Sequence, residues 1–228
     1  MASQRTLCQS VLKRLGRAGV LQDVVLVGSW CLEGYRSYFG RITPLTTLRT
    51  RDIDFLIPQP VRIRRSVDVP ALLQDLGFVI DFQGEGYIRL IHPELIVEFL
   101  VPERGRGTDR PVRVPQLGVN AQALRFLNML AESTITASLE GIKVRMPHPA
   151  AFALHKLLIA PRRQGRTGKQ AKDLDAAVAV LEALRAHGDI ESVRKHYGSM
   201  PSAWRTRIRH VLETHQELHD WLEHIVRD

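Results

Sequence analysis

The segment that most constrains the fold is LIVEFLVP, residues 95–102, in which Glu98 is the one charged residue among apolar side chains. A short run without alternating polar residues is typical of a β-strand that is buried on both faces. Such a strand belongs in the interior of a sheet that helices cover. A glutamate there costs several kcal/mol unless it pairs with a cation or binds a metal. A wet sheet edge or an ion pair with an arginine is the alternative explanation for Glu98.

A second predicted strand, DIDFLI, begins with Asp52 and Asp54 and is ended by Pro58. Side chains alternate along a strand, so both aspartates point to the same face. Two carboxylates this close repel each other unless a cation lies between them. A divalent metal that also contacts substrate phosphates would fill that place, whereas the alternative is a solvated strand end. If the two strands are neighbours, Asp52, Asp54 and Glu98 form one three-carboxylate cluster.

The rest of the chain alternates between strand and helix patterns up to about residue 146, and is helical from Pro149 onwards. We therefore predict an α+β fold with a mixed sheet flanked by helices in residues 1–146, and a C-terminal helical lobe in residues 147–228. Further strands are predicted at 23–29, 78–82, 86–91, 134–139 and 142–146, helices at 5–15, 30–40, 68–78 and 120–132, and a loop at 41–49.

The composition points to a polyanionic partner. The 228 residues carry a formal net charge of +8, with arginine-rich segments that include WRTRIRH at 204–210. Such a surplus attracts nucleic acid, nucleotides or anionic lipid, although an ordinary basic surface is the alternative. No apolar run reaches the roughly 18 residues of a membrane span, and the N-terminus has no signal-peptide pattern. With Cys8 and Cys31 as its cysteines, the protein is predicted to be cytoplasmic and not bound to membranes.

Three short motifs follow one another along the chain. They are VGSW at 27–30, RDIDF at 51–55 and VEF at 97–99. Together they resemble the nucleotidyltransferase fold superfamily that includes polymerase beta. The resemblance implies that Asp52 and Asp54 are metal ligands and that Glu98 is the third acid, around Mg²⁺ or Mn²⁺. It also implies that Gly28 and Ser29 face the phosphates of an NTP such as ATP. Glutamate in place of aspartate at position 98 departs from the superfamily pattern.

The gap between Ser29 and Asp52 is longer than in compact members of the superfamily. TTLRTRDID at 46–54 resembles instead the minimal bacterial members, including the AbiE-type toxin nucleotidyltransferases. By the same resemblance, Lys156 binds phosphate and Asp173 has a supporting catalytic role. From the residues alone, the default for Lys156 is extension to water, and Asp173 could instead be a carboxylate favoured near a helix N-terminus by the helix dipole.

The predicted activity is metal-dependent transfer of a nucleoside monophosphate from an NTP to an acceptor hydroxyl. The basic charge favours an RNA acceptor, such as a tRNA 3′ end, over a small drug, and a toxin would require an antitoxin partner. The alternatives are transfer to a protein or an aminoglycoside-like molecule, and a non-catalytic module that binds nucleotide or nucleic acid.

The histidines and tryptophans are interpreted as structural. His148 and His155 are expected to cap or pack helices, and Trp204 and Trp221 to pack between helices. The C-terminal histidines are expected to form a stripe on one amphipathic helix: His210, His215, His219 and His224.

Overall fold

The computed structural model describes residues 3–40, 50–84, 86–103, 110–163, 165 and 168–226. The loop predicted at 41–49 therefore lies outside the described residues. The chain divides into two compact units, Met1–Tyr38 with Arg49–Pro147, and Phe39–Leu48 with His148–Asp228. Each unit is described by itself below, and the predicted domain division after residue 146 stays a prediction.

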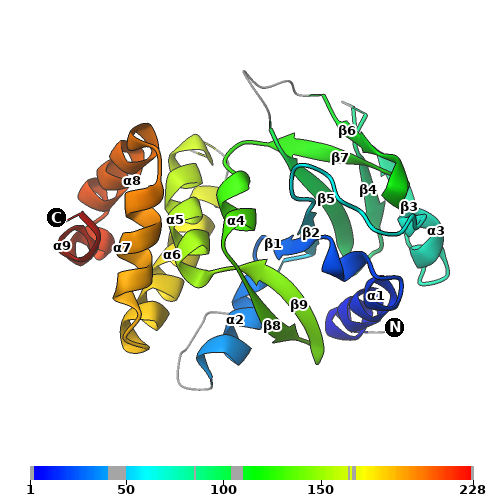
Figure 1. Cartoon of the computed structure of the whole chain (residues 1–228), viewed down its shortest axis with the longest axis horizontal. Helices are drawn as coiled ribbons and strands as arrows, with labels where there is room; N and C mark the ends of the chain where they lie inside the picture. The colour runs from blue at the N-terminus through cyan, green and yellow to red at the C-terminus, as the bar shows by residue number, and fades with distance from the viewer. Residues whose placement is uncertain are drawn as a thin grey trace. The chain divides into compact units, whose positions relative to one another are not determined.

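The first unit is built on a mixed β-sheet whose main path has the strand order β1-β2-β5-β4-β3 (Figure 1). β7 pairs with the far end of β5 and with β6, and β8 and β9 form a separate hairpin sheet. The strands are Val25–Val27 (β1), Asp52–Leu56 (β2), Val79–Phe82 (β3), Ile88–Ile91 (β4), Ile96–Pro102 (β5), Val112–Val114 (β6), Val119–Leu124 (β7), Thr134–Leu139 (β8) and Ile142–Pro147 (β9).

β5 holds the central position that its apolar sequence predicts. It pairs with β2 along one edge, and with β4 and then β7 along the other. Val97, Phe99 and Val101 are buried, and so is Leu100 on the opposite face. The mixed α+β fold predicted from the sequence is therefore confirmed in its sheet and its helices.

Helices α1 to α4 accompany this sheet. They span Gln4–Arg17 (α1), Cys31–Phe39 (α2), Val69–Gln74 (α3) and Asn128–Glu132 (α4), with 3-10 turns at Val20–Gln22 and Pro115–Leu117. α1 begins where the Ser3 side chain caps the amide of Thr6, and it buries the stripe that its spacing predicts, from Leu7 to Leu15. α3 begins at the Asp68 cap and is followed by Gly77 at a positive φ, which agrees with the predicted helix stop.

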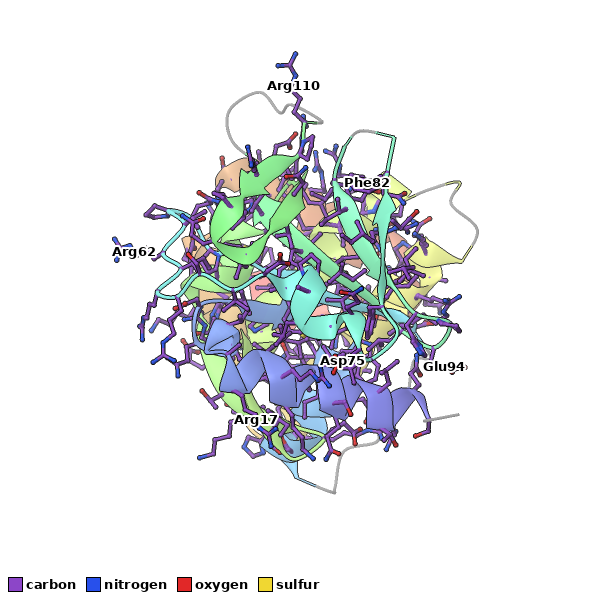
Figure 2. The ribbon with its side chains drawn as sticks, turned by 90° about the vertical axis from the view of Figure 1, so that its right-hand side faces the viewer. Arg17, Arg62, Asp75, Phe82, Glu94 and Arg110 are labelled. Atoms are coloured by element: carbon purple, nitrogen blue, oxygen red, sulfur yellow. The ribbon has the colours of Figure 1, made fainter. Side chains whose placement is uncertain are left out.

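β3 forms one edge of the sheet and exposes large apolar side chains to solvent. Within the described ranges it pairs with β4 alone, and its Val79, Ile80 and Phe82 are exposed. Figure 2 shows Phe82 at the end of the β3–β4 hairpin. The strand predicted at 78–82 is present, although its pattern did not indicate that it lies at an edge.

The single helix predicted at 120–132 is wrong. Residues Val119–Leu124 form β7, and helix α4 begins at Asn128. Two features of the structure break the helix: β7 pairs in parallel with the end of β5, and Phe126 has a φ of 68° that no α-helix continues through. Sheet pairing thus overrides the helix propensity of this segment. The short strand β6 was not predicted at all.

The second unit is helical (Figure 1). α5 lies at its centre, since nearly all of its residues are buried and it packs against α6, α7 and α8. The helices are Pro149–Ile159 (α5), Lys169–Ala186 (α6), Ile190–Ser199 (α7), Ser202–Thr214 (α8) and His219–Val226 (α9), with 3-10 turns at Ala160–Arg163 and Gln216–Leu218. Within the described ranges, none of the helices has the length and apolar character that crossing a bilayer requires.

The predicted C-terminal histidine stripe does not lie on one helix. α8 ends at Thr214, and His215 has an extended backbone before α9 starts at His219. The break lets α9 fold back on α7 and α8 and bury Trp221 and Ile225. The histidine spacing indicated one continuous helix. The free energy gained by burying these apolar side chains favours two shorter helices instead. The packing role predicted for Trp221 is confirmed.

Candidate active site

The two strands that carry the predicted acids are neighbours. β2 and β5 run in parallel, and Asp54 lies directly beside Glu98 in their register. Asp52, two residues earlier on β2, shares the face of Asp54 and is exposed, whereas Asp54 and Glu98 are half-buried. The opposite face of β2 carries Ile53 and Phe55, which are fully buried. The adjacency that the sequence left as a condition is therefore met in the structure.

Glu98 is also paired with an arginine, as one alternative anticipated. Arg89 lies beside it on β4, with its Nε 3.6 Å from a Glu98 carboxylate oxygen. Arg89 also bonds to Asp81 of β3, at 3.0 Å from its Nη2. Burial alone would lower the pKa of Arg89, but the hydrogen bond with Asp81 and the attraction of Glu98 outweigh it and raise that pKa. The arginine therefore stays charged and offsets the charge of Glu98.

The turn after β1 brings backbone against the Asp54 carboxylate. Val27 pairs with Asp54 across β1 and β2, and Gly28 follows with a φ of 75°. A Cβ on Gly28 would lie 2.1 Å from a carboxylate oxygen of Asp54, so glycine is the residue that fits. The amide of Cys31 then bonds to the Gly28 carbonyl, which starts α2. Gly28 and Ser29 therefore stand between the acid strand and a helix N-terminus.

α2 is held close to the sheet by residues that the sequence reasoning did not single out. A Cβ on Gly34 would lie 2.6 Å from the sulfur of Met146 on β9, so this glycine permits a close helix–strand approach. The Tyr35 hydroxyl donates to the carbonyl of Pro147 at 2.9 Å, and full burial raises the pKa of that hydroxyl well above its usual range. A glycine inside a helical pattern was the available signal for such a contact.

The donor set around Asp54 suits a hard divalent cation. Mg²⁺ takes one or two carboxylates and completes its octahedron with water and substrate phosphate oxygens. Asp52 and Asp54 on one face of β2 supply such a pair, whereas Glu98 shares its charge with Arg89. In the described part of the chain, no three His, Cys, Asp or Glu side chains are grouped closely enough to form a metal site by themselves. The three-ligand set of the sequence analysis thus stays a prediction.

In the second unit, Lys156 and Asp173 form a buried ion pair. The Lys156 ammonium on α5 lies 2.6 Å from one carboxylate oxygen of Asp173 on α6, and both residues are buried. Arg163 Nη1 lies 3.0 Å from the other oxygen, Oδ2. That contact is an ion pair without hydrogen-bond alignment, since Oδ2 has no hydrogen bond within the described residues. Asp173 therefore faces two cations and is directed inward, as its place on the helical stripe predicted.

Two histidines of α5 and its N-cap, His155 and His148, also lie in this unit. His155 is buried beside the pair, and burial, reinforced by Lys156 and Arg163, lowers its pKa to about 3. It is therefore neutral, which agrees with a packing role. His148 accepts a hydrogen bond from the amide of Ala150 at the start of α5, so its predicted capping role is confirmed. Burial and the neighbouring His196 lower the pKa of His148.

The predicted site residues thus fall into two sets. Asp52, Asp54, Glu98, Gly28 and Ser29 come together in the first unit, on β2, β5 and the turn after β1. Lys156 and Asp173 come together in the second unit. Sequence reasoning missed Arg89, Arg163, Gly34 and Tyr35, because their roles depend on partners distant in the chain.

One of three similar solved structures, the first described below, has a fold that agrees with this architecture. The crystal structure of ANT(2'')-Ia in complex with adenylyl-2''-tobramycin has a TM-score of 0.50 and 16% identity, over 90% of this chain and 98% of that one. The solution structure of the antibiotic-resistance factor ANT(2'')-Ia has a TM-score of 0.44 and 14% identity, over 86% and 96% of the two chains. A nucleotidyltransferase-like protein from Paracoccidioides brasiliensis has a TM-score of 0.39 and 17% identity, over 83% and 92%. At such identities, structural likeness concerns the fold alone.

The family of this protein is assigned from its sequence. A comparison with curated proteins finds no match. The sequence profile of a nucleotidyltransferase family, however, matches residues 6–201. This range includes the acid-bearing strands β2 and β5, the turn at Gly28 and the helices with Lys156 and Asp173. A match over most of the chain, through every predicted site residue, means that this protein belongs to the nucleotidyltransferase family.

Proposed function

We propose that the protein is a metal-dependent nucleotidyltransferase that moves a nucleoside monophosphate from an NTP to an acceptor hydroxyl, with RNA as the acceptor. The observation that carries the proposal is the position of the Asp54 carboxylate, which lies against the Gly28 backbone and beside Glu98. A carboxylate face next to a helix N-terminus combines ligands for a divalent cation with amide donors for phosphate.

The reaction that fits this site is an in-line displacement at phosphorus. The acceptor oxygen attacks the α-phosphorus, the bond from that phosphorus to the bridging oxygen of the β-phosphate breaks, and pyrophosphate leaves. A bound Mg²⁺ or Mn²⁺ would supply activation of the acceptor hydroxyl and neutralise charge on the phosphates. The hydroxyl proton passes to a base, for which Glu98 is the candidate.

Each predicted site residue has a role in this scheme. Asp52 and Asp54 would hold the metal, and the backbone amides at Gly28 and Ser29 would bind phosphate oxygens. Lys156 would contribute a further positive charge to the triphosphate. Asp173 would hold the Lys156 ammonium in place, a role that their 2.6 Å contact supports. Arg89 would keep Glu98 oriented on its strand.

Charge supports RNA as the acceptor class. The chain carries a formal net charge of +8, which attracts a polyanion and disfavours a cationic aminoglycoside. Exposed arginines such as Arg62 and Arg110 extend outward from the first unit (Figure 2). A tRNA 3′ end is the specific acceptor that we propose, and an antitoxin is the partner expected if this modification is toxic.

The test is incubation with each α-³²P-labelled NTP, Mg²⁺ or Mn²⁺, and total RNA. Label is expected in RNA with the intact protein and not with Asp54→Asn. The matched control is Asp175→Asn, an exposed aspartate on α6, which should keep full activity. Label in protein or in a small acceptor would support the transferase activity but identify an acceptor other than RNA. No label in any acceptor, together with unchanged RNA binding by Asp54→Asn, would favour a non-catalytic binding module.

A further inference from the structure

A small cavity in the second unit has the chemistry of a phosphate site. It lies between α7 and α8, which are neighbours within this unit (Figure 1). Its volume is about 170 Å³, and it is lined by Tyr197, Ser202, Arg205, Thr206 and Arg209. At about 30 Å³ for each water molecule, this volume has room for one phosphate group together with part of its hydration.

The two arginines that line the cavity have no ion-pair partner among the described residues. Arg205 and Arg209 lie one helical turn apart on α8, where like charges at this spacing repel each other. Neither guanidinium has an ion pair or a hydrogen bond to another group in the described part of the chain, and no carboxylate lines the cavity. The Nε of Arg205 is buried and has no hydrogen-bond acceptor among the described residues. Arg205 as a whole is half-buried and Arg209 is exposed, so an anion in the cavity would offset the charges of two guanidinium groups that are partly shielded from solvent.

Two other lining groups, Tyr197 and Thr206, donate their hydroxyl hydrogens to backbone carbonyls and so fix the backbone that carries the arginines. The Tyr197 hydroxyl donates to the carbonyl of Arg205 at 3.2 Å, which joins α7 to α8 at the cavity. The Thr206 hydroxyl donates to the carbonyl of Ser202 at 3.1 Å. Ser202 opens α8, and its N-cap residue is Pro201, which makes no side-chain capping bond. The amides of Trp204 and Arg205 donate to the Pro201 carbonyl, so those of Ser202 and Ala203 are the first-turn donors that remain for an anion within the described residues.

We propose that this cavity binds a backbone phosphate of the RNA acceptor, through the guanidinium groups of Arg205 and Arg209 and the start of α8. The proposal rests on the transferase function above and adds a place where the RNA is held. Arginine suits this task because its planar donors match two phosphate oxygens at once. The family match ends at residue 201, directly before α8, so family membership assigns no role to these side chains.

The test is equilibrium binding of a 5′-fluorescein-labelled tRNA, measured by anisotropy at several NaCl concentrations without NTP or divalent metal. The variants are Arg209→Ala, whose residue is exposed, and the double variant Arg205→Lys with Arg209→Ala. Arg113→Ala on β6 removes one exposed positive charge elsewhere and is the matched control. Circular dichroism and thermal melting establish that each variant is folded.

Loss of one phosphate contact should weaken tRNA binding roughly tenfold and lower the salt slope by about 0.7 to 0.9. The Arg113→Ala control should keep the wild-type slope. If Arg209→Ala and the double variant bind tRNA like this control, the proposal is overturned. Weaker binding of NTP with unchanged binding of tRNA would also overturn it, because the phosphate would then belong to the nucleotide.

This test is separate from that of the transferase function. Asp54→Asn should bind tRNA with the wild-type salt slope although it transfers no nucleotide. If the wild-type protein binds no tRNA but labels a small acceptor, the phosphate subsite fails and the transferase stands. If tRNA binding depends on Arg209 but no acceptor is ever labelled, the subsite stands and the transferase fails.

Discussion

At Gly28, the absence of a side chain decides whether the strand that carries Asp54 and the turn after β1 can lie against each other. The residue has a φ of 75°, and a Cβ would lie 2.1 Å from a carboxylate oxygen of Asp54. Gly141, in the turn between β8 and β9, has a φ of 77° but no atom within 4 Å of its Cβ position. The two glycines therefore share a positive φ, and only Gly28 lies against the Asp54 carboxylate.

Gly28→Ala is expected to reduce nucleotide transfer by roughly a hundredfold, since Asp54 must move away from its position. Both Gly28→Ala and Gly141→Ala should lower the free energy of unfolding by about 1 kcal/mol or somewhat more, because alanine disfavours positive φ. Initial rates and urea unfolding of both variants provide the comparison. Full activity in Gly28→Ala, or equal losses of activity in both variants, would contradict a specific contact with Asp54.

His155 makes stability depend on pH. Its pKa is lowered from the usual 6.5 to about 3 in the folded state, so below pH 6.5 the unfolded chain binds a proton that the folded chain does not. The folded state therefore loses about 1.4 kcal/mol per pH unit from this group as the pH falls from 6.5 towards 3. The neutral histidine contributes fully only above pH 6.5.

The variant His155→Leu should flatten the fall in the free energy of unfolding between pH 6.5 and 4. His210→Leu, at an exposed position on α8, is the matched control and should leave the slope unchanged. Urea unfolding at pH 7, 6, 5 and 4 measures both. An unchanged slope in His155→Leu would mean that water reaches this histidine in the folded protein.

At the scale of elements, one row of side chains crosses the sheet of the first unit. The register aligns Val27, Asp54, Glu98, Arg89 and Asp81 on β1, β2, β5, β4 and β3. This row holds three carboxylates, and Arg89 forms ion pairs with two of them, Glu98 and Asp81. The arginine lies on a strand whose charge pattern gave no hint of a site, because strand order decides its neighbours.

Glu98→Gln and Arg89→Leu should each lower the free energy of unfolding, and the double variant should lose less than the sum. A coupling of about 0.5–2 kcal/mol is expected, because the charges are half-buried and 3.6 Å apart. Urea unfolding of the four proteins gives the cycle. The pair Arg14 and Asp75, in which Asp75 is largely exposed, is the control and should show a smaller coupling. Strict additivity at Arg89 and Glu98 would show that Arg89 does not stabilise Glu98.

The elements also show where pattern reasoning succeeds and fails. β5 was predictable because burial on both faces leaves an unbroken apolar run. β7 was not, since its sequence favours helix and only its pairing with β5 makes it a strand. The break after Thr214 was missed for a similar reason: apolar burial of Trp221 and Ile225 decides it.

At the scale of the whole molecule, the residues with a proposed role are distributed over both units. Asp52 and Asp54 belong to the first unit, and Lys156 and Asp173 to the second. The Lys156–Asp173 pair has a structural explanation of its own, since a buried ion pair needs both partners. The role proposed for this pair in the reaction therefore has to be tested separately from its contribution to folding.

Asp173→Asn alone should destabilise the chain by about 3–5 kcal/mol, because it leaves the buried Lys156 ammonium unpaired. Lys156→Met alone should cost less, because Arg163 still lies 3.0 Å from the Asp173 carboxylate. The double variant should recover part of this loss. It should nevertheless show a KM for NTP raised roughly tenfold, since the positive charge for the triphosphate is gone. Lys172→Met, at an exposed position on α6, is the matched control. A double variant with wild-type KM would mean that the pair is structural alone.

Local pattern determined much of this protein. The apolar run around Glu98, the alternation at Asp52 and Asp54, and the glycine after β1 each follow from sterics and burial within a few residues, so the sequence alone predicted the α+β class and the family resemblance. The tertiary structure decided the rest. It places Asp54 beside Glu98 and Arg89 against Glu98, and it lets Arg205 and Arg209 line a cavity to which no described carboxylate contributes. These depend on strand order and helix packing, because contacts between residues distant in the chain are set by the burial of the whole core and leave no local pattern.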